Sequence, residues 1–92
     1  MEKRLGFVGL IIEDREKHAA PVNALLSEFG ELILARTGVP CPERNCSAIT
    51  LVVDATTDQL GSLTGKLGRI PGVSVKSMLS KVISPASSDE KL

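Results

Sequence analysis

Cys41 and Cys46 are the residues whose types and spacing come closest to a reactive site. Four residues separate them, a gap at the upper end of those found in zinc-binding cysteine pairs, and a zinc site also needs two further ligands nearby. Two thiols on one short loop can alternatively form a disulfide that responds to redox conditions, or they can stay reduced. Metal binding, a redox switch and free thiols all remain open, with free thiols as the simplest interpretation.

Acid–base or nucleophilic catalysis has no support in the residue types present. The chain has one histidine, His18, which falls in the polar start of a predicted helix and is expected to be solvated. A general base must lie beside the group it serves, and no serine–histidine–aspartate, cysteine–histidine or paired-carboxylate arrangement can be argued. We therefore expect no enzymatic activity and no catalytic residues. Because free thiols are the simplest interpretation of the two cysteines, we also expect no resident metal and no cofactor.

Three glycines recur on one side of the second predicted helix, at Gly61, Gly65 and Gly68. Each destabilises a helix interior by about 1 kcal/mol relative to alanine, so some contact should offset it. One explanation is close packing of this helix on the first. The other is that the bare backbone at Gly61 and Gly65 admits a ligand or a partner subunit, with Lys66 as a nearby anion contact.

Charged residues after the first predicted strand form a second candidate ligand site. Asp14 and Arg15 lie where this strand passes into the first helix, and loops beyond strand ends often hold ligands. The alternative is ordinary surface charge, with the carboxylate of Asp14 capping the helix by accepting from a free backbone N–H. Both residues therefore remain candidates for ligand binding or for an interface.

Length and composition narrow the remaining function classes. At 92 residues, with two Phe and no Trp or Tyr, the chain is expected to form one small domain with an aliphatic core. Eleven basic and eleven acidic residues provide neither the basic field nor the aromatic platforms used in direct nucleic-acid binding. The sequence predicts neither a signal peptide nor a membrane span, so we expect a cytoplasmic protein without membrane contact.

Hydrophobic spacing predicts four strands, as apolar or alternating runs at 5–12, 31–39, 47–54 and 73–79. Pro40 and Pro42 are expected to stop the pairing of the second strand. The residues after 83 have nothing to bury, so the tail 84–92 is expected to be disordered. The predicted domain is therefore residues 1–83.

Two helices are predicted from apolar stripes at i, i+3, i+4 spacing, which are Val22, Leu25, Leu26 and Phe29 in the first and Leu60, Leu63, Leu67 and Ile70 in the second. Pro21 removes a helical hydrogen bond, so a kink or an irregular first turn is expected, with the firm helix beginning near it. The second helix should start with a capping box in which Thr56 and Gln59 satisfy each other's backbone N–H groups.

This order of elements is that of an α+β, ferredoxin-like βαββαβ sandwich. Right-handed crossovers give a four-stranded antiparallel sheet in the order 4-1-3-2, with both helices on one face. The two central strands are apolar on both of their faces, so the face without helices would expose a large apolar patch. We therefore expect self-association, as a homodimer or a tetramer.

Segments 11–16, 36–40 and 63–76 together resemble the small family of iron-only hydrogenase system regulators, over about residues 4 to 81. The most specific block is Thr64-Gly65-Lys66-Leu67-Gly68, followed by Pro71-Gly72-Val73. That family is similar in fold to ACT domains and to the C-terminal domain of the nickel-responsive repressor, which oligomerise and bind small effectors between subunits. The nickel site itself uses several histidines and a cysteine, which this chain cannot reproduce.

The resemblance implies a non-catalytic, ACT-like regulatory module that acts through homo-oligomerisation and through binding of a small effector or a protein. If transcription is the regulated process, a separate DNA-binding or hydrogenase-related protein is needed, because no helix-turn-helix or ribbon-helix segment remains in the chain. The alternative is a metal or redox accessory protein for hydrogenase assembly that uses Cys41 and Cys46.

Overall fold

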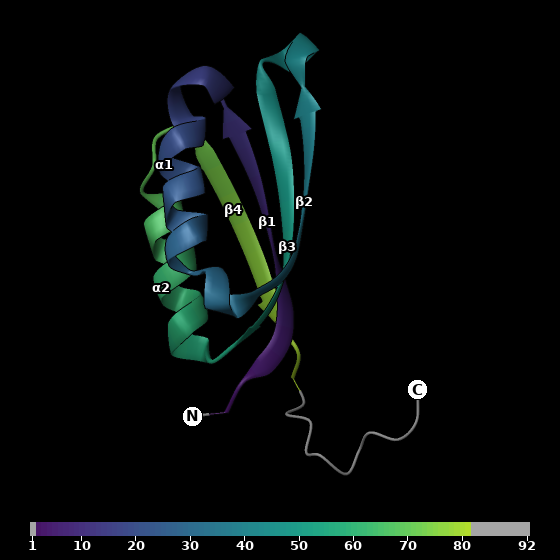
Figure 1. Ribbon diagram of the computed structural model, residues 1–92, viewed down its shortest axis with the longest axis vertical. Helices are drawn as coiled ribbons and strands as arrows, with labels where there is room; N and C mark the ends of the chain where they lie inside the picture. The colour runs from purple at the N-terminus through teal and green to yellow at the C-terminus, as the bar shows by residue number, and fades with distance from the viewer. Residues whose placement is uncertain (1, 82–92) are drawn as a thin grey trace.

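The computed structural model describes residues 2–81, which form a four-stranded antiparallel sheet covered on one face by two helices (Figure 1). In chain order the elements are β1 (Arg4–Glu13), α1 (Arg15–Glu28), β2 (Ile33–Cys41), β3 (Cys46–Ala55), α2 (Thr57–Gly68) and β4 (Val73–Leu79), with short 3-10 turns at Gly30–Leu32 and Pro42–Arg44. The strand order β2-β3-β1-β4 confirms the ferredoxin-like prediction. The predicted domain end at residue 83 and the tail 84–92 lie outside the described residues.

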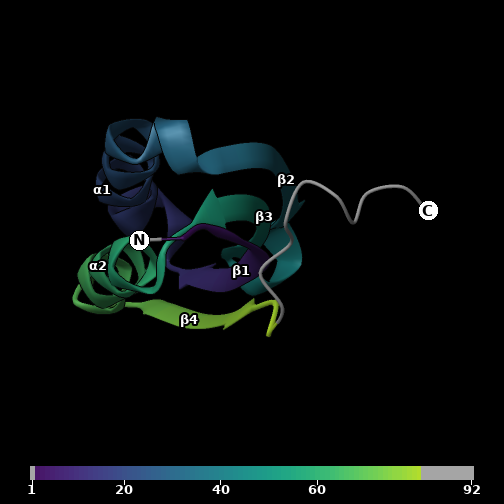
Figure 2. The same ribbon diagram turned by 90° about the horizontal axis from the view of Figure 1, so that it is seen from below.

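The core lies between the helices and one face of the sheet, and no other helix or strand of residues 2–81 covers the opposite face (Figure 2). Val8, Leu10 and Ile12 of β1 are buried there, because side chains alternate between the two faces of a strand. Both helices bury the predicted stripes, with Val22 and Leu26 from α1 and Leu60, Leu63 and Leu67 from α2. Each fully buried aliphatic side chain contributes about 1.5–3 kcal/mol relative to exposure. None of the helices within residues 2–81 is long and apolar enough to cross a membrane.

Helix α2 starts as predicted. The hydroxyl of Thr56 accepts from the backbone N–H of Gln59 at 3.1 Å, and the Gln59 side chain accepts from the backbone N–H of Thr56 at 2.9 Å. This reciprocal box satisfies two N–H groups that have no partner within the helix. The residue at which α2 starts is therefore set by local sequence.

The start of α1 differs from the prediction. The helix is continuous from Arg15 and runs through Pro21, six residues earlier than the expected firm start. Asp14 occupies the N-cap position, but its side chain makes no capping hydrogen bond. Its backbone is in the left-handed region (φ 51°, ψ 60°), whereas a capping side chain needs an extended backbone. The main-chain carbonyl of Asp14 instead accepts from Lys17 and His18 at 2.9 and 3.2 Å.

Strand β2 begins and ends two residues later than predicted, because a 3-10 turn precedes it and the strand continues past Pro40. The prediction that Pro40 stops the pairing was wrong, since Pro40 lies opposite Ser47 within the β2–β3 ladder. Proline is compatible with an edge strand, where one side of the backbone needs no ladder partner. β2 is such an edge, next to β3 alone. The later end brings Cys41 into the strand.

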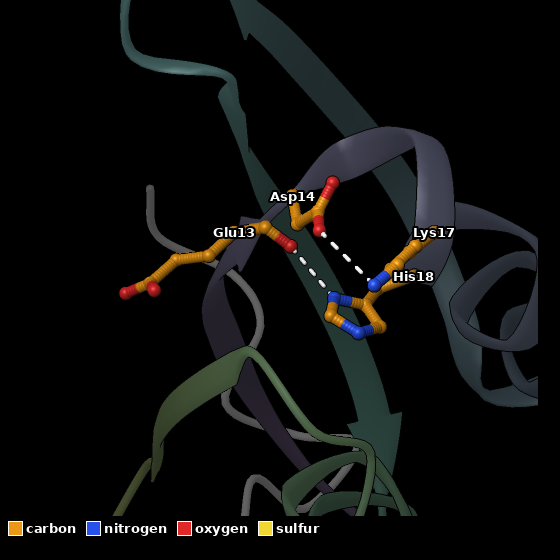
Figure 3. A network of polar contacts seen from close by, with 4 residues as sticks. All are labelled: Glu13, Asp14, Lys17 and His18. Atoms are coloured by element: carbon orange, nitrogen blue, oxygen red, sulfur yellow. Dashed lines mark hydrogen bonds and ion pairs between the residues drawn. The ribbon is translucent and has the colours of Figure 1, made fainter.

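His18 joins the end of β1 to the turn between α2 and β4, rather than extending into solvent as expected. Its Nδ1–H donates to the carbonyl of Glu13 at 2.8 Å (Figure 3). Because a carbonyl can only accept, this contact assigns the proton to Nδ1. The backbone N–H of Glu13 in turn donates to the carbonyl of Gly72 at 2.7 Å. The imidazole therefore helps to hold the first turns of α1 against the end of β1.

Gly72 has a backbone requirement that other residues do not meet. Its φ is 80°, and a Cβ added there would lie 2.5 Å from Nδ1 of His18 and 3.2 Å from the Glu13 carbonyl oxygen. Gly72→Ala is expected to lower the free energy of unfolding by about 1–3 kcal/mol, from strain and displaced contacts. Denaturant unfolding measures the change. Gly30→Ala, at a site with no neighbour within 4 Å, should change it by less than about 0.5 kcal/mol; equal losses for both variants would contradict the assignment.

Candidate functional site

The face of the sheet opposite the helices carries an apolar patch. Leu5 and Phe7 of β1, Val52 of β3 and Met78 of β4 are between 37% and 57% exposed, although all are large and apolar. Strand register places Phe7 directly between Val52 and Met78, so three side chains form one row across the sheet. We call these four residues the open-face patch. Together with Gly6 and Ser80 they line a shallow hollow of about 260 Å³.

The rest of this face is more polar. The next row that points the same way is Lys76, Gly9, Thr50 and Thr37, and it separates the patch from a further row that contains Ile11, Ala48 and Val39. Exposed large apolar side chains therefore form two groups on this face, the open-face patch at the Phe7 end and the smaller pair Ile11 and Val39 at the other end. Clustering of this kind is what marks an interface, whereas single exposed apolar residues need no explanation.

A second feature is a cleft between α1 and the edge strand β2, with a volume of about 220 Å³. The polar residues that line it are Arg15, Arg36, Asn23 and Ser47, and the apolar ones include Ile12 and Ile49. Nη2 of Arg36 donates to Oδ1 of Asn23 at 2.6 Å. We call this site the arginine cleft.

Neither arginine of the cleft has an acidic partner. Within residues 2–81 the ion pairs join Lys17 to Asp14 at 4.0 Å and Lys66 to Glu28 at 3.3 Å. Arg15 and Arg36 take part in neither pair, and no acidic residue lines the cleft. Two guanidiniums without a counter-charge, beside an amide and a hydroxyl, present donors that match a carboxylate or a phosphate.

Of the two candidate site residues predicted at the end of β1, the structure places only one in the arginine cleft. Arg15 lines the cleft, whereas Asp14 lies outside it, with its carboxylate turned to Lys17 (Figure 3). Sequence reasoning missed Arg36 and Asn23, because a single cation in a strand and a single amide on a helix carry no motif. They meet only because α1 packs beside β2.

The glycine surface of α2 faces open space. A Cβ at Gly61 or Gly65 would meet nothing within 4 Å, so close packing on α1 does not explain these two residues. Gly61 lines a shallow cleft between α2 and β4. Lys66 has partners at α1, since it contacts Glu28 and lies 5.5 Å from the centre of the Phe29 ring. It therefore links the two helices.

Cys41 and Cys46 are free thiols, each partly buried, at the closed end of the β2–β3 hairpin. Within the part of the chain that the structure describes, no group of three or more His, Cys, Asp or Glu residues is placed to hold a metal ion. The pair is therefore not part of a metal centre formed by residues 2–81 of one subunit.

Comparison with known proteins decides the family. Residues 4–77 match the TM1266-like family model, described as "Iron-only hydrogenase system regulator, putative". The chain belongs to this family. The solved structure of the TM1266 protein from Thermotoga maritima, described as uncharacterized, is 46% identical with a TM-score of 0.84, and the match covers 87% of this chain and all of that one.

More distant structures share the TM1266-like fold. The ACT domain of the GTP pyrophosphokinase from Chlorobium tepidum has a TM-score of 0.70 at 20% identity, covering 83% of this chain and 99% of that one. The C-terminal domain of MgtC from Mycobacterium tuberculosis has a TM-score of 0.67 at 16% identity, covering 90% and 94%. Among curated proteins none matches the sequence. The fold is therefore ACT-like, as the resemblance implied.

The exposed glycines of α2 give a prediction for stability. Gly65→Ala should raise the free energy of unfolding by about 0.5–1 kcal/mol, because the new Cβ enters open space and alanine favours the helix. Denaturant unfolding at low protein concentration measures the gain. Gly6→Ala is the matched opposite, since its Cβ would collide with the backbone oxygen of Met78, and it should destabilise. A loss of stability in Gly65→Ala under these conditions would contradict the assignment of Gly65 to open space.

Proposed function

We propose that this TM1266-like protein is a non-catalytic regulatory module of an iron-only hydrogenase system, which binds a small anionic effector in the arginine cleft and associates with a second copy through the open-face patch. The observation that carries the proposal is the pair of arginines, Arg15 and Arg36, that line one cleft and have no acidic partner within residues 2–81. The family description and the ACT-like fold support a regulatory role.

The cleft favours a small ligand with a carboxylate or phosphate group. Its volume of about 220 Å³ is below the usual range for drug-sized ligands. Arg36 is already oriented by its hydrogen bond to Asn23, so less side-chain freedom is lost when an anion binds. Arg15 lies at the first position of α1, where the helix dipole also favours negative charge.

The open-face patch favours association with a second copy of the chain. An isologous contact needs one surface that complements itself, and a flat apolar row centred on Phe7 can pack against its own copy about a two-fold axis. The chain carries equal numbers of acidic and basic residues, so two copies do not repel each other through net charge. A homodimer is the simplest such assembly.

Catalysis and resident metal chemistry have less support. Nδ1 of the single histidine is held by the Glu13 carbonyl, and no metal-binding group occurs within residues 2–81. As a regulator in the cytoplasm, the module would pass its signal to another protein, because residues 2–81 contain no helix-turn-helix or ribbon-helix element for reading DNA.

The effector site is tested by replacing one arginine. In a thermal-shift and titration panel of inorganic phosphate, small carboxylates, amino acids and nucleotides, the wild-type protein should be stabilised by at least one anion. Arg36→Gln should weaken that affinity by about tenfold or more, as expected for loss of one charge-assisted hydrogen bond. Arg69→Gln removes the same charge outside the cleft and should have little effect. Equal losses of anion affinity in both variants would show that the anion responds to the overall charge of the protein and not to a specific site in the cleft.

Association is tested at the centre of the patch. Phe7→Ser should shift the protein toward monomer in sedimentation or light-scattering measurements, because it removes the apolar side chain between Val52 and Met78. Ala20→Ser introduces the same serine at an exposed position of α1, on the other side of the sheet, and should leave the molar mass unchanged. A wild-type protein that is monomeric at millimolar concentration would contradict the dimer.

A further inference from the structure

The two cysteines lie directly opposite each other across the β2–β3 hairpin. Cys41 and Cys46 are Cα partners in the ladder, and they form its last pair before the tip Pro42–Asn45. From the sequence, both cysteines were expected on one loop, and the distance between their thiols could not be predicted. The structure instead ends one strand and begins the next at these two residues.

This register brings the Cα atoms of the two cysteines within the range that a disulfide can span. Directly opposed residues in an antiparallel ladder have Cα atoms about 4.5–5.5 Å apart, and disulfides span Cα separations of about 4.4–6.8 Å. Successive pairs alternate between the two faces of the sheet, so both side chains of one pair extend from the same face. Each cysteine is partly exposed, so a small reagent can reach it. No shift of the backbone register is needed to join them.

We infer that Cys41 and Cys46 form a reversible intramolecular disulfide that clips the tip of the β2–β3 hairpin. The reaction is thiol–disulfide exchange with a low-molecular-weight disulfide. The thiolate of one cysteine attacks a sulfur of the reagent, forms a mixed disulfide and releases one small thiolate. The second cysteine then attacks the protein sulfur of the mixed disulfide and releases the other small thiolate. The protein loses two hydrogens and is oxidised, and one reagent disulfide is reduced to two thiols.

The clip would act on the segment that holds the first turn of α1. The backbone N–H of Arg15 donates to the carbonyl of Asn45 at 3.4 Å, and Asn45 is itself in the left-handed region with φ 55°. Pro40 and Ser47, the neighbours of the two cysteines, lie opposite each other and line the arginine cleft. Closing the short loop removes freedom from the tip in both folded and unfolded chains. Oxidation therefore makes one wall of the cleft more rigid.

Oxidation and the open-face patch do not compete for the same surface. The cysteine pair lies next to Glu13 in the register, at the far end of β1 from Phe7. At about 3.4 Å per residue this is roughly 20 Å along the strand. The disulfide can therefore form in a monomer or in a dimer built on the patch, and its test is independent of the proposed function.

The experiment equilibrates the full chain in mixtures of oxidised and reduced glutathione, a linear disulfide that releases two small thiols, then quenches with acid and measures intact mass. The wild-type protein should lose two hydrogens at oxidising ratios and recover them on reduction. Its Tm should rise by about 5–10 °C on oxidation, as expected for closing a short loop in a domain of this size. Amide exchange at Arg15 should slow, because its acceptor, the carbonyl of Asn45, lies within the clipped tip.

Cys46→Ser is the matched control, since it retains Cys41 and nearly the same side-chain volume. It should show neither the mass loss nor the rise in Tm, whereas phosphate binding in the reduced state should match that of the wild type. An unchanged wild-type mass at every ratio, or oxidation that yields only cross-linked dimers, would overturn the inference. Failure of the effector proposal would appear separately, as absence of anion binding in both redox states.

Discussion

The rest of the structure depends on β1, a strand that is hydrogen-bonded on both edges and apolar on both faces. It pairs with β3 on one side and β4 on the other, and its helix-facing residues Val8, Leu10 and Ile12 form the centre of the core. Two helices cover only one face of a sheet of this size. Because the side-chain period of a strand is two, Leu5, Phe7 and Ile11 must face the other way. One strand therefore sets both the fold and the apolar character of the face that the helices leave open.

Local sequence signals predicted most of the fold, and they failed where tertiary contacts decide. The capping box of Thr56 and the alternation of β4 depend on residues a few positions apart, and both are confirmed. Pro21 removes one hydrogen bond, yet the buried Val22 beside it holds α1 against the sheet and the helix continues. Pro40 is likewise compatible with β2 only because this strand lies at an edge. Neither outcome can be predicted from propensity alone.

The candidate site was predicted in part. Arg15 was identified because the strand-to-helix junction is a common ligand position, but Arg36 lies in another element and is recognisable only once α1 is packed beside β2. The glycines of α2 are the opposite case. Their spacing along the helix is evident in the sequence, but the sequence does not show whether they pack against α1 or face open space. Gly61 and Gly65 face open space, which removes packing within the subunit as their explanation. Sites built from distant segments require the packed structure, whatever the strength of the local pattern.

The same strands connect the arginine cleft, the cysteine pair and the open-face patch, and this limits how one can influence another. β3 supplies Ser47 to the cleft and Val52 to the patch, but it is paired along both edges and is therefore a rigid element. Coupling between two sites requires an element with two arrangements whose equilibrium both sites bias. The hairpin tip beyond Pro40 is the better candidate, because it lies at the end of the β2–β3 ladder and contacts α1 through the long 3.4 Å hydrogen bond from Arg15 to Asn45. A signal from the cleft would therefore pass to whatever touches the tip and the β2 edge, rather than through the sheet to the patch.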